Sequence, residues 1–187
     1  MSFSTDVKRE AAALPMKKTC CRRALIAGAL LGGAMGCDDE IALQTDDAAA
    51  AELCARLVRE QFGRECEPQP IGKRGFLLTF PSRSAAALIR DSAADPRVLI
   101  RCPECAAALF RGLFLGGGTI SAPRNYYHLE LKSRAAVDPS PLAALAVIGV
   151  IVSITMSISR ILMARFRMFV FVIVFSPFLH KMNSFVR

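Results

Sequence analysis

The chain has 187 residues, with 24 lysines and arginines, 16 acidic residues and a formal net charge of +8. Residues 1–140 hold 19 basic and 16 acidic residues, whereas residues 141–187 hold five basic residues and no acidic one. The basic total is therefore weak support for nucleic-acid binding by the first part, and the length favours one domain with an appendage. Seven scattered cysteines and no signal peptide at the start favour reduced, cytosolic thiols.

Apolar periodicity and turn residues predict a mixture of helices and antiparallel strands. We expect Thr19 to cap the second helix and Gly36 to stop it. Asp46 or Asp47 would cap the third helix, and Ser82 the fourth. In chain order the predicted elements are a helix over 4–14, a helix over 20–35, a strand over 40–45, a helix ending at Phe62, a hairpin of strands 65–71 and 75–80, a helix over 84–91, a helix from Pro103 to Gly116–Gly118, and a hairpin of strands 119–122 and 126–132.

One segment occurs twice: residues 21–33 and 105–117 are identical at seven of 13 positions, at an offset of 84. Two related helices so far apart indicate two halves of a pseudo-symmetric unit. A glycine inside a helix costs about 1 kcal/mol relative to alanine. Each repeat contains such a glycine, so we expect a packing interaction that compensates for its cost. Small residues four positions apart would let the two helices pack closely. These packing positions are Ala24, Gly28 and Gly32 in the first repeat, and Ala108, Gly112 and Gly116 in the second.

Residues 26–34 and 110–120 resemble the LAGLIDADG motif of homing endonucleases. The resemblance implies an α+β fold in which two motif helices pack along a pseudo-twofold axis, flanked by antiparallel sheets that sit over DNA. The opening Met1–Ser4, the run Cys20–Ala24, the segment Phe110–Gly118 and Tyr127–Glu130 narrow the resemblance to the WhiA family of sporulation and cell-division regulators. That resemblance covers roughly residues 1–135.

Metal-dependent DNA cleavage is not expected. A LAGLIDADG nuclease needs an acidic residue at the end of each motif helix, because the two carboxylates hold the divalent cations that activate water. Gly33 and Gly117 stand at these positions, and no acid lies in residues 21–37 or 105–129. The WhiA family likewise has the scaffold without the nuclease centre. We therefore expect no enzyme, no cofactor and no small-molecule substrate.

Two other features have residue types that occur in metal or catalytic sites. Cys102 and Cys105 have the spacing of half a zinc site, with Cys20 and Cys21 at the equivalent place in the first repeat. Adjacent residues on a helix point about 100° apart, so the pattern favours no metal site. His128 has no paired nucleophile in the sequence and is expected to be structural.

DNA is the expected partner, and the chain is expected in the cytoplasm at the nucleoid. Cations on hairpin tips and helix ends could contact the phosphates of DNA, although ordinary solvated surface explains them equally well. These candidates are Arg22, Arg23, Arg64, Lys73, Arg74 and Arg124.

The C-terminal part departs from the family. WhiA proteins carry a helix-turn-helix domain that nothing here matches, and the second half is incomplete. Residues 141–159 are uncharged and near the length of a transmembrane helix. Three explanations remain open: a frameshift or gene-prediction error, a membrane anchor that would make this a small membrane-associated protein, or a tail that packs on the domain. The expected divisions are an N-terminal helix (1–18), a first half (19–100), an incomplete second half (101–137) and an apolar, helical tail (138–187).

Overall fold

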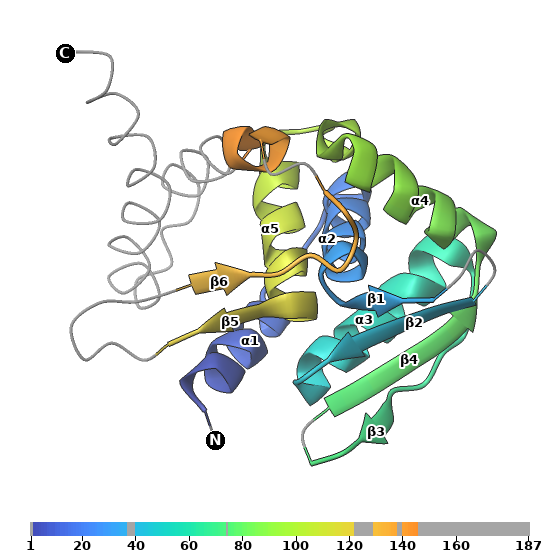
Figure 1. Ribbon diagram of the computed structural model, residues 1–187, viewed down its shortest axis with the longest axis vertical. Helices are drawn as coiled ribbons and strands as arrows, with labels where there is room; N and C mark the ends of the chain where they lie inside the picture. The colour runs from blue at the N-terminus through green and yellow to red at the C-terminus, as the bar shows by residue number, and fades with distance from the viewer. Residues whose placement is uncertain (1, 37–39, 74, 122–128, 138–139, 146–187) are drawn as a thin grey trace.

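The computed structural model describes residues 2–36, 40–73, 75–121, 129–137 and 140–145. Two helices stand side by side at the centre, and the sheets lie at one end of this pair (Figure 1). The elements are α1 (Phe3–Ala13), α2 (Thr19–Gly33), β1 (Ala34–Met35), β2 (Glu40–Thr45), α3 (Ala48–Phe62), β3 (Gln69–Ile71), β4 (Gly75–Pro81), α4 (Arg83–Ala94), the 3-10 helix η1 (Pro96–Leu99), α5 (Glu104–Gly117), β5 (Gly118–Ile120) and β6 (Leu129–Leu131).

The central pair, α2 and α5, consists of the two repeated segments and runs in parallel. A β-carbon at Gly28 would lie 2.1 Å from the Leu109 carbonyl oxygen, and one at Gly112 would lie 2.0 Å from the Leu25 carbonyl oxygen. The two backbones are therefore in direct contact. Only glycine permits this approach. This explains why both helices contain a glycine, although glycine disfavours helix formation.

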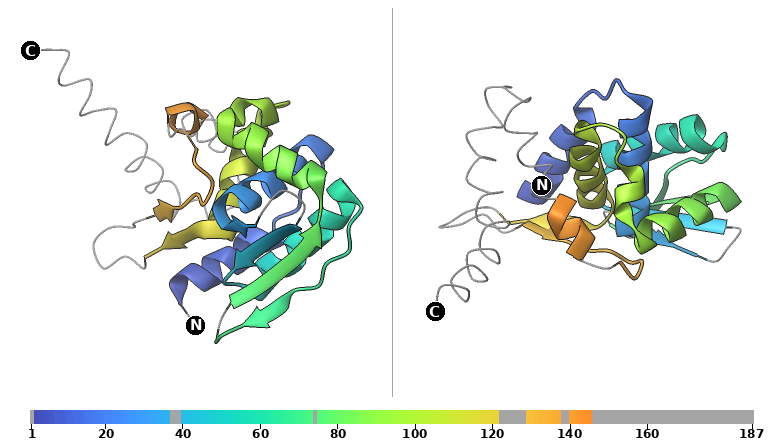
Figure 2. Two further views of the ribbon diagram at one scale, coloured as in Figure 1. Left: turned by 45° about the vertical axis from the view of Figure 1, so that its right-hand side comes forward. Right: turned by 90° about the horizontal axis from the view of Figure 1, so that it is seen from above.

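The first half forms a four-stranded antiparallel sheet in the order β1-β2-β4-β3. Ile41, Leu43 and Thr45 alternate along β2 and are buried, so they form the inner face of the sheet. The helices cover this inner face, and the two further views show them on the same side of the sheet (Figure 2). The core is consequently shared between the helix pair and the inner face of this sheet.

The second half repeats the start of the first. β5 follows α5 directly, as β1 follows α2, and each pairs antiparallel with the next strand. The fold class expected from the sequence is therefore confirmed: two central helices with flanking antiparallel sheets.

The expected boundaries of α2 were wrong at both ends. Thr19 is the first helical residue and not the cap, and its hydroxyl oxygen accepts a hydrogen bond from Arg22 Nη2 at 3.3 Å. The helix ends at Gly33, because Ala34 and Met35 pair with Leu43 and Ala42 of β2. Gly36, with a φ of +127°, directly follows β1 and does not stop the helix.

Other helix ends agree with the sequence. Asp47 caps α3 by accepting a hydrogen bond from the Ala50 N–H at 3.1 Å, and Ser82 caps α4 by accepting one from the Ala85 N–H at 3.1 Å. Gly63 ends α3 with a φ of +62°. These local signals work because a cap depends on one or two neighbouring residues.

Only the first residues of the apolar tail are described. Residues 140–145 are helical and pack on the domain, with Leu145 4% exposed and Leu142 against the core. The rest of the expected membrane span over 141–159 lies outside the described residues. Among the helices that the structure describes, none combines the length and apolar character needed to cross a membrane.

Candidate functional site

The C-terminal ends of α2 and α5 meet between the two sheets, where the resemblance places the nuclease acids. A β-carbon at Gly33 would lie 2.4 Å from the Gln44 carbonyl oxygen. One at Gly117 would lie 2.6 Å from the Gly32 carbonyl oxygen and 2.7 Å from that of Lys132. Neither position has room for any side chain, because the obstructing atoms are backbone oxygens. An oxygen-lined gap of this kind would also repel a carboxylate.

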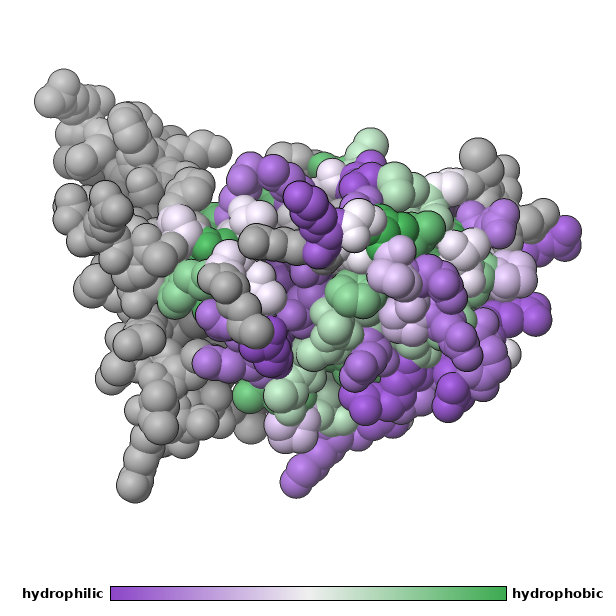
Figure 3. All heavy atoms as spheres, turned by 90° about the horizontal axis from the view of Figure 1, so that it is seen from below, coloured by the Kyte–Doolittle hydropathy of each residue, from purple (hydrophilic) through white to green (hydrophobic). Residues whose placement is uncertain are grey.

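The outer face of the sheets carries no basic residue within its strands. Along β2 the side chains that alternate with the buried ones are Glu40, Ala42 and Gln44, and these share the face with Thr79 of β4. On β6, Glu130 is exposed and accepts a hydrogen bond from the Thr119 hydroxyl at 3.5 Å. Figure 3 shows the molecule from below, with hydrophilic side chains over much of the face on the side of the four-stranded sheet. Within the described part of the sheets, cations that could contact phosphates lie at the edges and tips and not along the strands.

The structure separates the candidate cations into three groups. Arg22 is engaged internally: its Nη1 donates to the carbonyl oxygen of Lys17 at 2.9 Å, and its Nε lies 3.0 Å from Glu60 Oε2 without hydrogen-bond alignment. Arg23, Arg64 and Lys73 are exposed. Lys73 stands at the tip of the β3–β4 hairpin. Arg74 and Arg124 lie outside the described residues, as does His128.

A further cation, which was not predicted from the sequence, lies where the second half meets the first sheet. Arg134 follows β6, is exposed, and donates from Nη2 to Gln44 Oε1 on the outer face of β2 at 3.0 Å. Its backbone N–H donates to the Leu31 carbonyl oxygen of α2 at 2.9 Å. Arg134 thus joins the second half to the first sheet. No sequence signal marks it, because its position depends on contacts between the halves.

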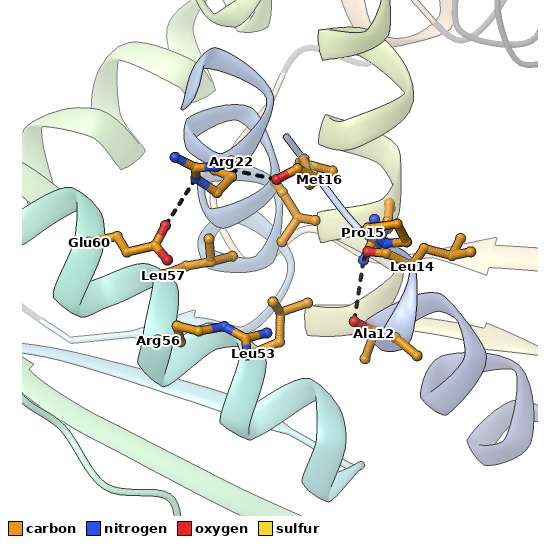
Figure 4. Close-up of a pocket in the computed structure, with 12 residues that line it drawn as sticks. Ala12, Leu14, Pro15, Met16, Arg22, Leu53, Arg56, Leu57 and Glu60 are labelled. Carbon is orange, nitrogen blue, oxygen red and sulfur yellow. Dashed lines mark hydrogen bonds and ion pairs between the residues drawn. The ribbon is translucent and has the colours of Figure 1, made fainter. Parts of the chain in front are cut away.

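A pocket of about 410 Å³ lies between α1, α2 and α3 (Figure 4). Leu53 and Leu57 give it apolar walls, while Arg56 and Glu60 lie at its edge. Arg111 reaches it from α5 and donates to the Leu14 carbonyl oxygen at 2.6 Å. Burial lowers the pKa of Arg111 to about 10. The pocket contains no cysteine, serine or histidine that could act as a nucleophile or base.

Four cysteines converge at the N-terminal ends of α2 and α5, opposite the ends where Gly33 and Gly117 lie. We call them the thiol cluster (Cys20, Cys21, Cys102 and Cys105). Their Sγ atoms all lie within 4.8 Å of one another. Cys21 and Cys105 are buried, and Cys20 and Cys102 are partly buried. Among the described residues, this is the one place where three or more side chains that could bind a metal ion come together.

This convergence corrects the expectation that adjacent cysteines would point apart. The Sγ atoms of Cys20 and Cys21 lie within 4.8 Å of each other, and both are close to the Sγ atom of Cys102. Cys102 precedes α5 and is 3.6 Å from Cys20 Sγ and 3.4 Å from Cys21 Sγ. The close parallel packing of the two helices brings Cys105 to within 4.0 Å of Cys21 Sγ. The directions of side chains on one helix do not predict this site, because it is built from two helix starts.

The surroundings of the thiol cluster affect its members differently. Burial raises the pKa of Cys21, and it raises that of Cys102 to about 11. Burial also acts to raise the pKa of Cys105, but hydrogen bonds from the backbone of Arg101 and from Cys102 outweigh it and lower that pKa. A hydrogen bond from Cys102 and the ion pair with Lys18 lower the pKa of Glu104 to about 2.

Comparison with protein families agrees with this geometry. Residues 106–165 match the family described as the WhiA LAGLIDADG-like domain. The match begins in α5 and crosses residue 138, where the tail was expected to start. The chain is 27% identical over 153 residues to a protein of Heliobacterium modesticaldum named "Probable cell division protein WhiA", covering 70% of this chain and 48% of the relative. A protein of the same name from Syntrophomonas wolfei is 29% identical over 155 residues, with 70% and 49% covered.

Solved structures give the same fold. The N-terminal LAGLIDADG domain of DUF199/WhiA superposes with a TM-score of 0.61 at 19% identity, covering 78% of this chain and 73% of that one. Full-length DUF199/WhiA from Thermatoga maritima superposes with a TM-score of 0.55 at 20% identity, covering 70% of this chain and 44% of that one. The resemblance to WhiA is therefore confirmed. The chain spans about half the length of the curated relatives it matches.

Proposed function

We propose that this WhiA-like chain is a non-catalytic DNA-binding regulator that acts in cell division, sporulation and their transcriptional control. The relatives it resembles are named cell division proteins. The observation that carries the non-catalytic part is the pair Gly33 and Gly117. Both occupy positions where backbone oxygens lie less than 3 Å from any added β-carbon. A nuclease centre at this place would need two carboxylates and the metal ions that they hold.

DNA is the proposed partner because the scaffold presents an open sheet face with cations at its margins. Lys73 extends the face at one hairpin tip, and Arg134 lies between the two sheets. Arg23 and Arg64 remain candidates of lower rank, because no contact ties them to a sheet. With no basic residue within the strands, binding would rest on few phosphate contacts. Such binding depends strongly on salt and little on sequence.

The test is a salt titration of DNA binding. The purified full chain is added to a fluorescein-labelled random duplex, and anisotropy gives the affinity at several salt concentrations. Each phosphate contact contributes about −0.9 to the slope of log K against log salt. We expect Arg134→Gln to make the slope less negative by about 1, with little change in sequence preference.

Arg59→Gln is the matched control. Arg59 is an exposed arginine on α3, it is paired with Glu65 at 2.7 Å, and its helix covers the inner face of the sheet. Its replacement should leave the slope unchanged. If the chain does not bind DNA, or if both variants change the slope equally, the proposed DNA interface is wrong.

A further inference from the structure

The thiol cluster has the dimensions of a tetrahedral metal site. Four sulfurs at about 2.3 Å from one ion lie about 3.8 Å from one another. Four of the six Sγ pairs are separated by 3.6 Å (Cys20 and Cys102), 3.4 Å (Cys21 and Cys102), 4.0 Å (Cys21 and Cys105) and 3.5 Å (Cys102 and Cys105). The other two pairs lie within 4.8 Å. Small rotations of the side chains would make these distances equal.

A second observation comes from the helix starts. Lys18 precedes α2 and Pro103 precedes α5, and neither makes a side-chain capping bond. α3 and α4, by contrast, are both capped by side chains. Two helix starts without a side-chain cap therefore meet at the same point, each with the positive end of its dipole. The positive dipole ends favour the thiolate, which is the form of cysteine that binds metal, and so oppose the burial that raises the pKa of Cys21 and Cys102.

The position of the cluster suits a structural ion. Two of its thiols are buried and two are partly exposed, so the site is enclosed on one side and accessible on the other. Lys18 and Glu104 form an ion pair across the same two helix starts, with Nζ 2.8 Å from Oε1. The two halves of the pseudo-symmetric unit are thus already joined here by charge.

We propose that Cys20, Cys21, Cys102 and Cys105 bind one Zn²⁺ ion that fastens the N-terminal ends of the two central helices to each other. Four thiols within 4.8 Å leave room for one ion and not for a cluster whose thiolates bind separate irons. Binding replaces the thiol protons by the metal and releases them to solvent, with no change of oxidation state. The site contributes to folding and is independent of DNA binding.

The experiment begins with the full chain purified under reducing conditions without chelator. Metal analysis should find one zinc per chain. After zinc removal and addition of Co²⁺, the wild type should show intense thiolate-to-cobalt absorption and the visible bands of tetrahedral cobalt. Cys102→Ser should lower both the zinc content and the cobalt absorption at least tenfold. Cys66→Ser is the control, because Cys66 is a partly exposed cysteine outside the cluster, and it should bind like the wild type.

A second measurement avoids variants that fail to fold. The wild-type chain is alkylated with and without Zn²⁺, and the modified cysteines are located by peptide mass spectrometry. Zinc should protect the two partly exposed cluster cysteines, Cys20 and Cys102, and leave Cys66 reactive. The proposal is overturned if no zinc copurifies and Co²⁺ produces no thiolate absorption. It is also overturned if Cys66→Ser loses metal as fully as Cys102→Ser, or if reduced protein shows no zinc-dependent protection.

Discussion

A methyl group at Gly112 would separate the two central helices. The β-carbon of Gly112→Ala would lie 2.0 Å from the Leu25 carbonyl oxygen and 2.8 Å from the Ala29 nitrogen. An unstrained contact needs about 3.5 Å, so the helices would have to move apart by about 1.5 Å. On a helix without such a neighbour, the same substitution would stabilise the protein by about 1 kcal/mol. The sign of the effect therefore reports whether the backbones touch.

We expect Gly112→Ala to lower the free energy of unfolding by about 3 kcal/mol, the upper end of the usual cost of overpacking, because the obstructing atoms belong to the backbone. Urea unfolding of the full chain, followed by far-ultraviolet circular dichroism, would show the midpoint falling by about 1.5 M at a slope of about 2 kcal/mol/M. Gly63→Ala is the control: no atom lies within 4 Å of its β-carbon, and its φ of +62° should cost only about 1 kcal/mol. If Gly112→Ala is as stable as the wild type, the close helix pair is refuted.

Three further substitutions or modifications test the packing. Asp46→Ala should lower the free energy of unfolding by about 2 kcal/mol in the same urea assay, because it leaves the buried Lys8 ammonium without its carboxylate; an unchanged midpoint would contradict this. Thr45→Val should lower the free energy of unfolding by about 1 kcal/mol, because the Thr45 hydroxyl donates to the Leu115 carbonyl oxygen at 2.9 Å near the end of α5. Calorimetry would measure this loss, and a more stable variant would contradict the prediction. Burial raises the pKa of Cys54 to about 12, so mass spectrometry should find it unmodified by iodoacetamide at pH 8 until urea is added.

The sequence predicts most of the fold because its main signals are local or repeated. Caps at Asp47 and Ser82 act within a few residues, and the β2 alternation matches its buried face. The repeat at an offset of 84 carried the non-local information, since two copies of one glycine pattern imply a pair of helices. The predicted end of α2 was wrong because Ala34 and Met35 form β1 and do not continue the helix. Their strand conformation depends on pairing with β2, which the local sequence does not show.

The candidate sites were less accessible to sequence reasoning. The loss of both acids could be recognised from Gly33 and Gly117 alone, but the backbone oxygens that fill the space come from other elements. Arg134 reaches Gln44 only because the second half lies against the first sheet. The thiol cluster was set aside because the direction of side chains on one helix says nothing about a cysteine between two helices.

The proposed absence of catalysis is best tested by a DNA cleavage assay under conditions where the chain binds DNA. Supercoiled plasmid is incubated with the full chain and millimolar Mg²⁺ or Mn²⁺, at protein concentrations that saturate the anisotropy signal. Because neither central helix ends in a carboxylate, the account predicts no nicked or linear product above that of a mock purification. Cleavage that increases with protein concentration, disappears with EDTA and is absent from the mock purification would contradict the non-catalytic reading.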